Sequence, residues 1–306
     1  MFPFSGLHTA APDDAIVYPF SKRLGGNRSC AASVFSLSRT VLIIASCLHF
    51  VTFLLFLFLS LFVAGGGFTL AVTITQFDFV LGVYVTDTVI AAVPGFVYPG
   101  IFTLLSCLEH LVQVVKYKWF MSRIAAGQNE LKWLFYGFSA PWMSTGTLHL
   151  AGCTEFFVLA AVWVLTSITM AFGYAVDNVS RRDHPKARKW LFWIGWVPVI
   201  WAWITILVYT HRAPNVPGFV YAVVWTLFVM FNTFGISMAL LVYDIYTPDP
   251  DPPMSRFTVA NASEPDQTEP VRYARAYARY TVIDVWLSYI AKILLPAIVF
   301  GGVLRP

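Results

Sequence analysis

Charged residues are scarce in this 306-residue chain, at 12% of the sequence. Hydrophobic residues make up 58%, and the mean hydropathy is +0.68. A soluble globular domain carries about 25% charged residues, because its surface faces water. The composition therefore excludes an ordinary soluble protein and indicates an integral membrane protein in contact with lipid. The net charge of +4 is small and does not point to a nucleic-acid partner.

Cysteine is scarce as well, and the four thiols lack metal-type spacing. We therefore expect no disulfide framework and no metal site from Cys30, Cys47, Cys107 and Cys153. The loops carry no nucleophile triad or phosphate-binding loop, so we expect no enzyme activity. Residues 1–38 lack an early hydrophobic core with a cleavage site, so we expect a cytoplasmic N-terminal tail and no signal peptide.

Long apolar runs dominate the rest of the chain. Each is about 20 residues long, enough for a helix to cross the hydrocarbon layer. The runs are 40–63, 93–117, 132–152, 154–176, 190–210, 217–244 and 279–303. Residues 39–304 are therefore predicted to form one all-α membrane domain of seven transmembrane helices.

Two connecting segments differ from the spans. The sequence "FTLAVTITQFDFVLGVYVT", within 65–92, alternates and is rich in Thr, Val and Phe, which predicts a short extracellular β-hairpin between helices 1 and 2. Residues 246–270 hold six prolines and several acids, which predicts a flexible cytoplasmic loop.

Lysine and arginine are distributed unevenly between the two sides. Seventeen of the 20 lie on one side: in the N-terminal tail and in the loops between spans 2 and 3, spans 4 and 5, and spans 6 and 7. Lys132 is counted with the loop between spans 2 and 3. The positive-inside rule then predicts a cytoplasmic N-terminus and an extracellular C-terminus.

Ionisable residues inside the spans are few and mark functional positions. They are His49, Glu109, His110, His149, Glu155, Asp284 and Lys292, with Asp244 at the inner end of the sixth span. Lys292 lies near mid-depth, where a charged lysine costs about 3 kcal/mol or more. Ser288 and Asp284 lie one and two turns before it on the same stripe. This pattern fits an amine that forms a Schiff base with an aldehyde; it fits equally a lysine paired with a carboxylate for structure.

The stretch "LLSCLEHLVQ" in the second span is another polar group. Ser106 and His110 are four residues apart and share one helix face. His110 alone is explained by a hydrogen bond to another helix, whereas a carboxylate at Glu109 needs a compensating partner in lipid.

These motifs resemble those of heliorhodopsins, retinal proteins whose orientation is inverted relative to ordinary microbial rhodopsins. "LSYIAK" resembles the family's L-S-x-x-A-K and supplies Ser288 and Lys292. "LSCLEH" resembles S-x-L-x-H and supplies Ser106 and His110, and "CLHF" supplies His49. The sixth span, with "VPGFVY" and then "FVMFNTFG", resembles the family's sixth helix through Phe231 and Asn232, and "FWIG" fits the fifth. The resemblance covers about residues 40–303 and implies a rhodopsin-like bundle with all-trans retinal bound to Lys292 as a Schiff base.

One departure concerns the third span. The family's W-x-E-Y-S carries the glutamate that balances the charge of the protonated Schiff base. Trp133 and Tyr136 match this pattern, but Phe135 stands at the glutamate position and Gly137 at the serine position. Either Glu109 supplies the negative charge from the second span, which we favour, or the Schiff base is neutral in the dark.

The resemblance also implies a pocket and a role. The pocket residues are Phe138, Met143, Thr166, Trp203 and Phe231. The cluster of His49, Ser106 and His110 is expected to hold a proton after retinal isomerises towards 13-cis. A sensory photoreceptor with a cytoplasmic signalling partner, and a homodimer in the lipid membrane, are the expectations. The alternative is a light-gated proton channel or transporter, because Glu109 and Asp284 lie on the cytoplasmic side of Lys292.

Overall fold

The protein is described by a computed structural model covering residues 28–58, 61–62, 69–94, 96–179, 184–245 and 268–303. Eight helices and one two-stranded sheet are found in these ranges. In chain order they are α2 (Arg28–Phe58), β1 (Thr69–Asp78), β2 (Val83–Pro94), α3 (Val97–Val115), α4 (Tyr117–Ala125), α5 (Glu130–Leu150), α6 (Phe156–Asn178), α7 (Pro185–Arg212), α8 (Gly218–Val242) and α9 (Thr268–Val303). Of the flexible loop predicted at 246–270, residues 246–267 lie outside the described residues, whereas residues 268–270 form the start of α9.

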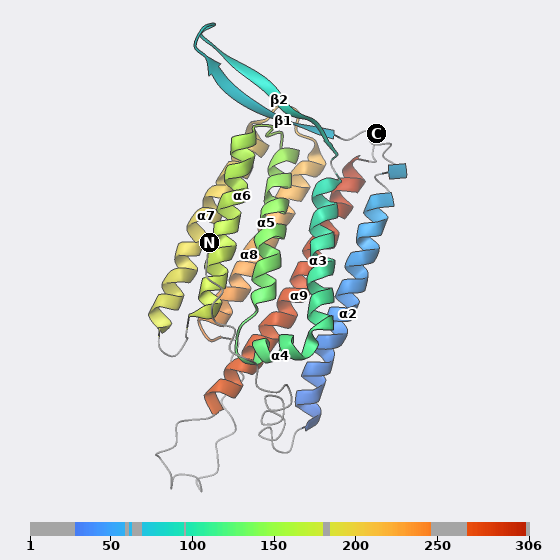
Figure 1. Ribbon diagram of the computed structural model, residues 1–306, viewed down its shortest axis with the longest axis vertical. Helices are drawn as coiled ribbons and strands as arrows, with labels where there is room; N and C mark the ends of the chain where they lie inside the picture. Colours follow the sequence, from blue (N-terminus) through green and yellow to red (C-terminus); the bar gives the residue numbers. More distant parts are fainter. Residues whose placement is uncertain are drawn as a thin grey trace.

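The long helices form a bundle with the hairpin at one end and α4 at the other (Figure 1). Six of them are long and apolar enough to cross a membrane: α2, α3, α6, α7, α8 and α9. The sequence predicted seven such helices, so the number that qualify by length and composition is one smaller than predicted. The predicted span outside this set is the third, 132–152, which corresponds to α5, a helix of 21 residues.

Helix α5 is less apolar because it lies inside the bundle. It contacts α3, α6, α7 and α8, and therefore has little surface to present to lipid. Its buried polar side chains are Lys132, Ser139, Ser144, Thr147 and His149. Hydropathy measures preference for lipid, and a helix surrounded by protein needs less of it.

The helix boundaries differ from those predicted. Helix α2 begins at Arg28, before the predicted limit of the tail at residue 38, and α9 begins at Thr268 rather than near residue 279. The short helix α4 was not predicted. The Asn129 side chain accepts a hydrogen bond from the Lys132 backbone N–H at 3.1 Å and caps α5.

The predicted β-hairpin between α2 and α3 is confirmed. β1 pairs with β2 in antiparallel register from Thr69 opposite Pro94 to Asp78 opposite Val83. The Asp78 carboxylate accepts hydrogen bonds from the Val80 and Leu81 N–H groups, at 2.8 and 3.0 Å, and closes the turn. Gly82 follows with a φ of 67°, a left-handed conformation that glycine adopts without strain.

Hydrogen bonds attach the hairpin to the bundle. The Thr73 N–H donates to the Thr154 carbonyl at 2.8 Å, and the Thr75 N–H donates to Glu155 at 2.9 Å. The His149 ring joins the Ala71 carbonyl through Nε2 at 2.8 Å and the Tyr98 hydroxyl through Nδ1 at 2.7 Å. His149 and Glu155 therefore have structural partners at this end of the bundle.

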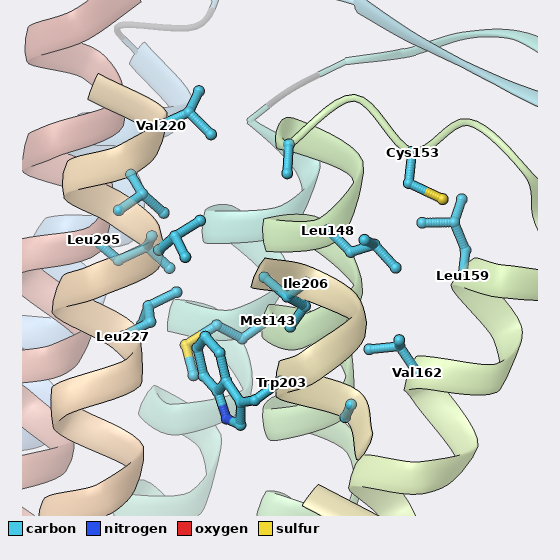
Figure 2. Close-up of a cluster of buried hydrophobic side chains, with 14 of the residues drawn as sticks. Met143, Leu148, Cys153, Leu159, Val162, Trp203, Ile206, Val220, Leu227 and Leu295 are labelled. Atoms are coloured by element: carbon cyan, nitrogen blue, oxygen red, sulfur yellow. The ribbon is translucent and has the colours of Figure 1, made fainter. Parts of the chain in front are cut away.

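Two clusters of buried apolar side chains fill the bundle. The cluster at the hairpin end joins α5, α6, α7 and α8 through residues such as Leu148, Leu159, Ile206 and Leu227 (Figure 2). The second cluster lies towards α4 and includes Phe120, Trp133 and Tyr280. Met143 and Trp203 of the first cluster also face the cavity described next.

Candidate functional site

A cavity of about 500 Å³ lies among helices α3, α5, α6, α7, α8 and α9. Its walls are mainly aromatic and aliphatic, with Trp196, Trp203 and Phe231 among the lining residues. Polar groups gather on α5 and α9, where Lys132, Tyr136, Asp284, Ser288 and Lys292 line it. An apolar cavity with a few convergent polar groups is the usual form of a small-molecule site.

Lys292 is the residue of greatest chemical interest in this cavity. Its side chain is 2% exposed, and its Nζ has no hydrogen-bond partner among the described residues. The nitrogen lies 5.2 Å from the centre of the Phe102 ring and 5.3 Å from that of Tyr136. A buried amine surrounded mainly by aromatic rings, without a hydrogen-bonded carboxylate, is free to react.

Asp284 is paired with a different lysine. Its Oδ1 lies 3.1 Å from the Lys132 Nζ, and both side chains are almost completely buried. The Tyr136 hydroxyl donates to the second oxygen, Oδ2, at 3.2 Å. Lys132 also donates to the Tyr280 hydroxyl. Lys132 was counted with the basic residues of the loop between the second and third spans, but its amine is buried against α9.

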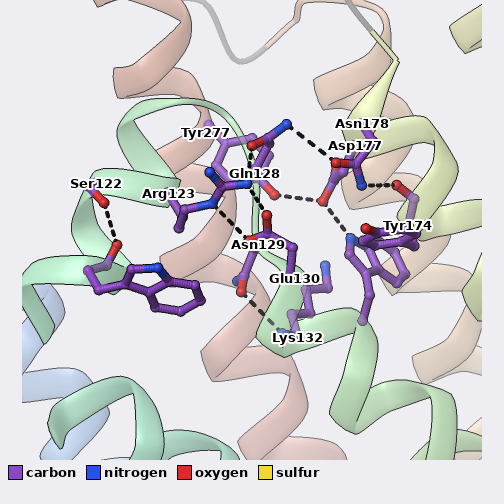
Figure 3. A network of polar contacts seen from close by, with 12 residues as sticks. Ser122, Arg123, Gln128, Asn129, Glu130, Lys132, Tyr174, Asp177, Asn178 and Tyr277 are labelled. Atoms are coloured by element: carbon purple, nitrogen blue, oxygen red, sulfur yellow. Dashed lines mark hydrogen bonds and ion pairs between the residues drawn. The ribbon is translucent and has the colours of Figure 1, made fainter. Parts of the chain in front are cut away.

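A second polar network, which includes Asp177 and Tyr277, lies at the end of the bundle that carries α4 (Figure 3). The Trp133 indole N–H donates to Asp177 at 2.5 Å, and the Tyr277 hydroxyl donates to the same oxygen at 2.7 Å. These contacts join α5, α6 and α9 at one end of the cavity. The bond to Asp177 fixes the position of the Trp133 ring, and Trp133 lines the cavity. Asp177 therefore helps to shape the cavity wall.

Glu109 does not line the cavity, yet its side chain is buried in the bundle, with 3% of its surface exposed. The Gln113 side chain donates to its Oε1 at 3.1 Å, while Oε2 has no hydrogen-bond partner in the described part of the chain. It lies within electrostatic reach of Lys292. Glu109 therefore carries a buried carboxylate that no cation of the described residues neutralises by direct contact.

The three residues of the predicted cluster, His49, Ser106 and His110, are all buried. The two imidazole rings stack, with centroids 5.4 Å apart. Ser106 donates to the Phe102 carbonyl of its own helix at 2.9 Å. His110 bonds to Gln113 at 3.1 Å through Nδ1, and both nitrogens of His49 lack partners among the described residues.

The predicted pocket residues divide into two groups. Those that line the cavity are Tyr136, Met143, Trp203, Phe231, Asn232, Ser288 and Lys292. Phe138 does not, and at 56% exposed it points away from the bundle. The reason is helix periodicity: the lining positions of α5 are Lys132, Trp133, Tyr136, Ser139, Ala140 and Met143. Phe138 falls on the opposite face.

Thr166 also lies outside the cavity. It is fully buried and donates to the Val162 carbonyl at 2.9 Å, one helical turn back. On α6 the lining begins at Thr169, closer to the C-terminal end of the helix.

Sequence reasoning missed three contributors to the site: Gln113, Lys132 and Asp177. Gln113 could have been found from its spacing, because it lies four residues after Glu109 and three after His110 on one helix face. Lys132 and Asp177 lie near predicted span ends, where a charge is usually hydrated, so hydropathy carries no signal of their burial.

Comparison with known proteins agrees with this geometry. A search of curated proteins gives no match. The family model described as Heliorhodopsin matches residues 38–247, more than half of the chain and most of the segment from α2 to α8. The match ends before α9, so it does not include Lys292. On the strength of this match, the chain belongs to the heliorhodopsin family.

Proposed function

We propose that this multi-pass membrane protein is a photoreceptor that binds all-trans retinal covalently at Lys292. The observation that carries the proposal is a buried Lys292 amine without a hydrogen-bond partner in the described residues, at the wall of an apolar cavity of about 500 Å³. Membership of a family of rhodopsin-type photoreceptors supports it.

The cavity fits the cofactor in size and chemistry. Its volume lies in the range of about 300–1,000 Å³ that is usual for small-molecule sites. Bound as a Schiff base, retinal would supply light absorption and an isomerisable double bond. Tyr136, Trp203 and Phe231 offer aromatic faces to a polyene, and Ser288 lies one turn before the lysine. Burial would also keep water away from the linkage to Lys292.

Glu109 is proposed to balance positive charge on the Lys292 nitrogen. Phe135 cannot serve at the position where the family pattern has glutamate, and Asp284 is engaged by Lys132. The Oε2 of Glu109 has no hydrogen-bond partner among the described residues, which leaves the carboxylate available to balance a positive charge. Gln113 orients this carboxylate and also contacts His110, which links the charge-balancing group to the histidine pair.

The stacked His49 and His110 rings are proposed to hold a proton released from the Lys292 nitrogen. A neutral imidazole accepts a proton on the ring nitrogen that carries no hydrogen. Of the four ring nitrogens of His49 and His110, three lack a hydrogen-bond partner among the described residues. Storage of the proton inside the protein, without release across the membrane, suits a slow sensor that signals to a cytoplasmic partner.

Reconstitution with all-trans retinal tests the proposal. The wild-type protein should gain a visible or near-ultraviolet band, and borohydride reduction should leave a retinyl adduct on Lys292. Lys292→Ala should gain neither, whereas Lys186→Ala, which removes an exposed lysine, should behave like the wild type. Pigment formation by Lys292→Ala would refute the site.

Glu109→Gln tests the charge-balancing role. The substitution keeps the shape of the side chain but removes its charge, so the absorption maximum should shift strongly or the visible band should disappear. An unchanged spectrum would reject Glu109 in this role and leave a neutral Schiff base, or another carboxylate, as the explanation.

Light-gated proton conduction is the second candidate. The buried Lys132, Asp284 and Tyr136 contacts form a polar path from the cavity towards the end of the bundle that carries α4. Photocurrent in a voltage-clamped cell would favour conduction, and its absence would favour signalling. The inferred orientation, with the N-terminus cytoplasmic, can be tested by protease access to epitope tags at the two ends.

A further inference from the structure

Two buried lysines and two buried carboxylates occupy this region of the bundle. Lys132 and Lys292 both line the cavity, and each is at most 3% exposed. Asp284 also lines it, and Glu109 is buried behind it. Buried charges are stable only when they are compensated. Which carboxylate compensates which lysine therefore decides how positive charge at Lys292 is tolerated.

The contacts assign Asp284 to Lys132. The Lys132 Nζ lies 3.1 Å from Asp284, and Tyr136 donates to the other carboxylate oxygen at 3.2 Å. Both oxygens are thus engaged from α5. Lys132 is held in place by Tyr280, whose ring centre lies 4.4 Å from its nitrogen. Neither partner can turn to water, because both side chains are buried.

Asp284 nevertheless lies within electrostatic reach of Lys292. The two residues share one stripe of α9, two turns apart, and their side chains interact electrostatically. Tyr136 lies between them: its hydroxyl bonds to Asp284, and its ring centre is 5.3 Å from the Lys292 Nζ. In a low-dielectric interior, the interaction between a charge on Asp284 and a charge on Lys292 is only weakly screened.

We propose that Lys132 is a positioning residue that holds and neutralises Asp284, so that Glu109 alone balances the charge on the Lys292 nitrogen. This inference rests on the proposed function of Lys292. In this arrangement the charge of Asp284 is compensated by the Lys132 ion pair between α5 and α9, and not by the Lys292 nitrogen. The arrangement is consequential because Phe135 stands where the family pattern has glutamate, and the residues by which α5 lines the cavity include no carboxylate.

The other titratable groups around this end of the cavity come from the helices packed against α9. They are His49 on α2, Glu109 and His110 on α3, Lys132 and Tyr136 on α5, and Tyr280 and Asp284 on α9 itself. Asp177 on α6 interacts with Lys132 from the far side. A change in the Lys132–Asp284 pair alters the charge next to Tyr136 while leaving Lys292, Glu109 and both histidines in place.

The test follows the pH at which the retinal-reconstituted protein loses its visible band. Lys132→Met leaves the Asp284 charge unpaired, which favours positive charge at Lys292, so the midpoint should rise by on the order of one pH unit. Asp284→Asn leaves Lys132 unpaired, so the midpoint should fall. Lys132→Met combined with Asp284→Asn removes both charges and should return the midpoint close to the wild-type value. Lys132→Arg keeps the pair and should shift it little.

The outcomes separate this inference from the proposed function. If no variant and no wild-type protein forms a pigment at Lys292, the proposed function fails. If pigment forms but neither single substitution moves the midpoint, or the double variant moves it as far as Lys132→Met, the inference alone is overturned. Should Lys132→Met not fold, the opposite shift in Asp284→Asn and its cancellation in the double variant still decide the matter.

Discussion

Gly173→Ala should destabilise the protein because a methyl group at this position collides with Trp133. A Cβ built on Gly173 would lie 2.2 Å from both Cη2 and Cζ3 of the indole ring. Carbon atoms pack at about 3.5–4.0 Å, so the ring has to move by more than about 1 Å. The indole N–H donates a hydrogen bond at 2.5 Å to Asp177, which lies one turn after Gly173 on α6. A shift of the ring by this distance would break the bond.

Three contributions set the size of the effect. Overpacking a buried site costs about 1–3 kcal/mol, and loss of a hydrogen bond to a charged group costs about 1.5–3 kcal/mol. Replacing glycine by alanine inside a helix returns about 0.5–1 kcal/mol. The net loss of unfolding free energy is therefore about 2–5 kcal/mol. Because Trp133 lines the cavity, retinal uptake should fall as well.

Gly137→Ala is the matched control. Gly137 lies within α5, and a Cβ there would meet no atom within 4 Å. This substitution should leave stability unchanged or raise it slightly, by about 0.5–1 kcal/mol. Thermal unfolding can be followed with a thiol-reactive dye, since Cys107 and Cys153 are buried in the folded protein.

A double-mutant cycle isolates the hydrogen bond. Trp133→Phe should cost less in the Gly173→Ala background than in the wild type, because the bond to Asp177 is already lost there. The reasoning is refuted if Gly173→Ala melts no earlier than Gly137→Ala, or if the cost of Trp133→Phe is the same in both backgrounds.

Two further predictions concern the ends of the bundle. Gly146→Ala places a Cβ 2.5 Å from Cγ of Tyr98, whose hydroxyl bonds to His149, so hydrogen exchange of the β1 amides should accelerate, and unchanged exchange would contradict this link. Arg123→Ala removes an ion pair with Glu130 whose side chains are 35% and 28% exposed, so it should cost less than about 1 kcal/mol. Asn129→Ala removes the cap of α5 and should cost about 1 kcal/mol or more in the same unfolding assay, so the reverse order would contradict the assignment.

The sequence alone was sufficient to place the long helices and the hairpin. Lipid cannot hydrogen-bond to the backbone, so apolar runs of about 20 residues form helices whatever their neighbours are. Alternation with β-branched residues in 69–94 similarly predicts paired strands, because side chains alternate across a strand. The stripe of Asp284, Ser288 and Lys292 follows from helix geometry within one segment, and Ser288 and Lys292 both line the cavity.

Only the tertiary structure decided which side chains meet across helices. Lys132 and Asp284 are separated by 152 positions, and their contact depends on how α5 and α9 are rotated and packed. A hydropathy window averages over a whole helix, so it detected neither the burial of Lys132 nor the outward direction of Phe138. Local sequence sets the period of a helix, whereas packing sets its rotation, and the charge partners of the site are determined by that rotation.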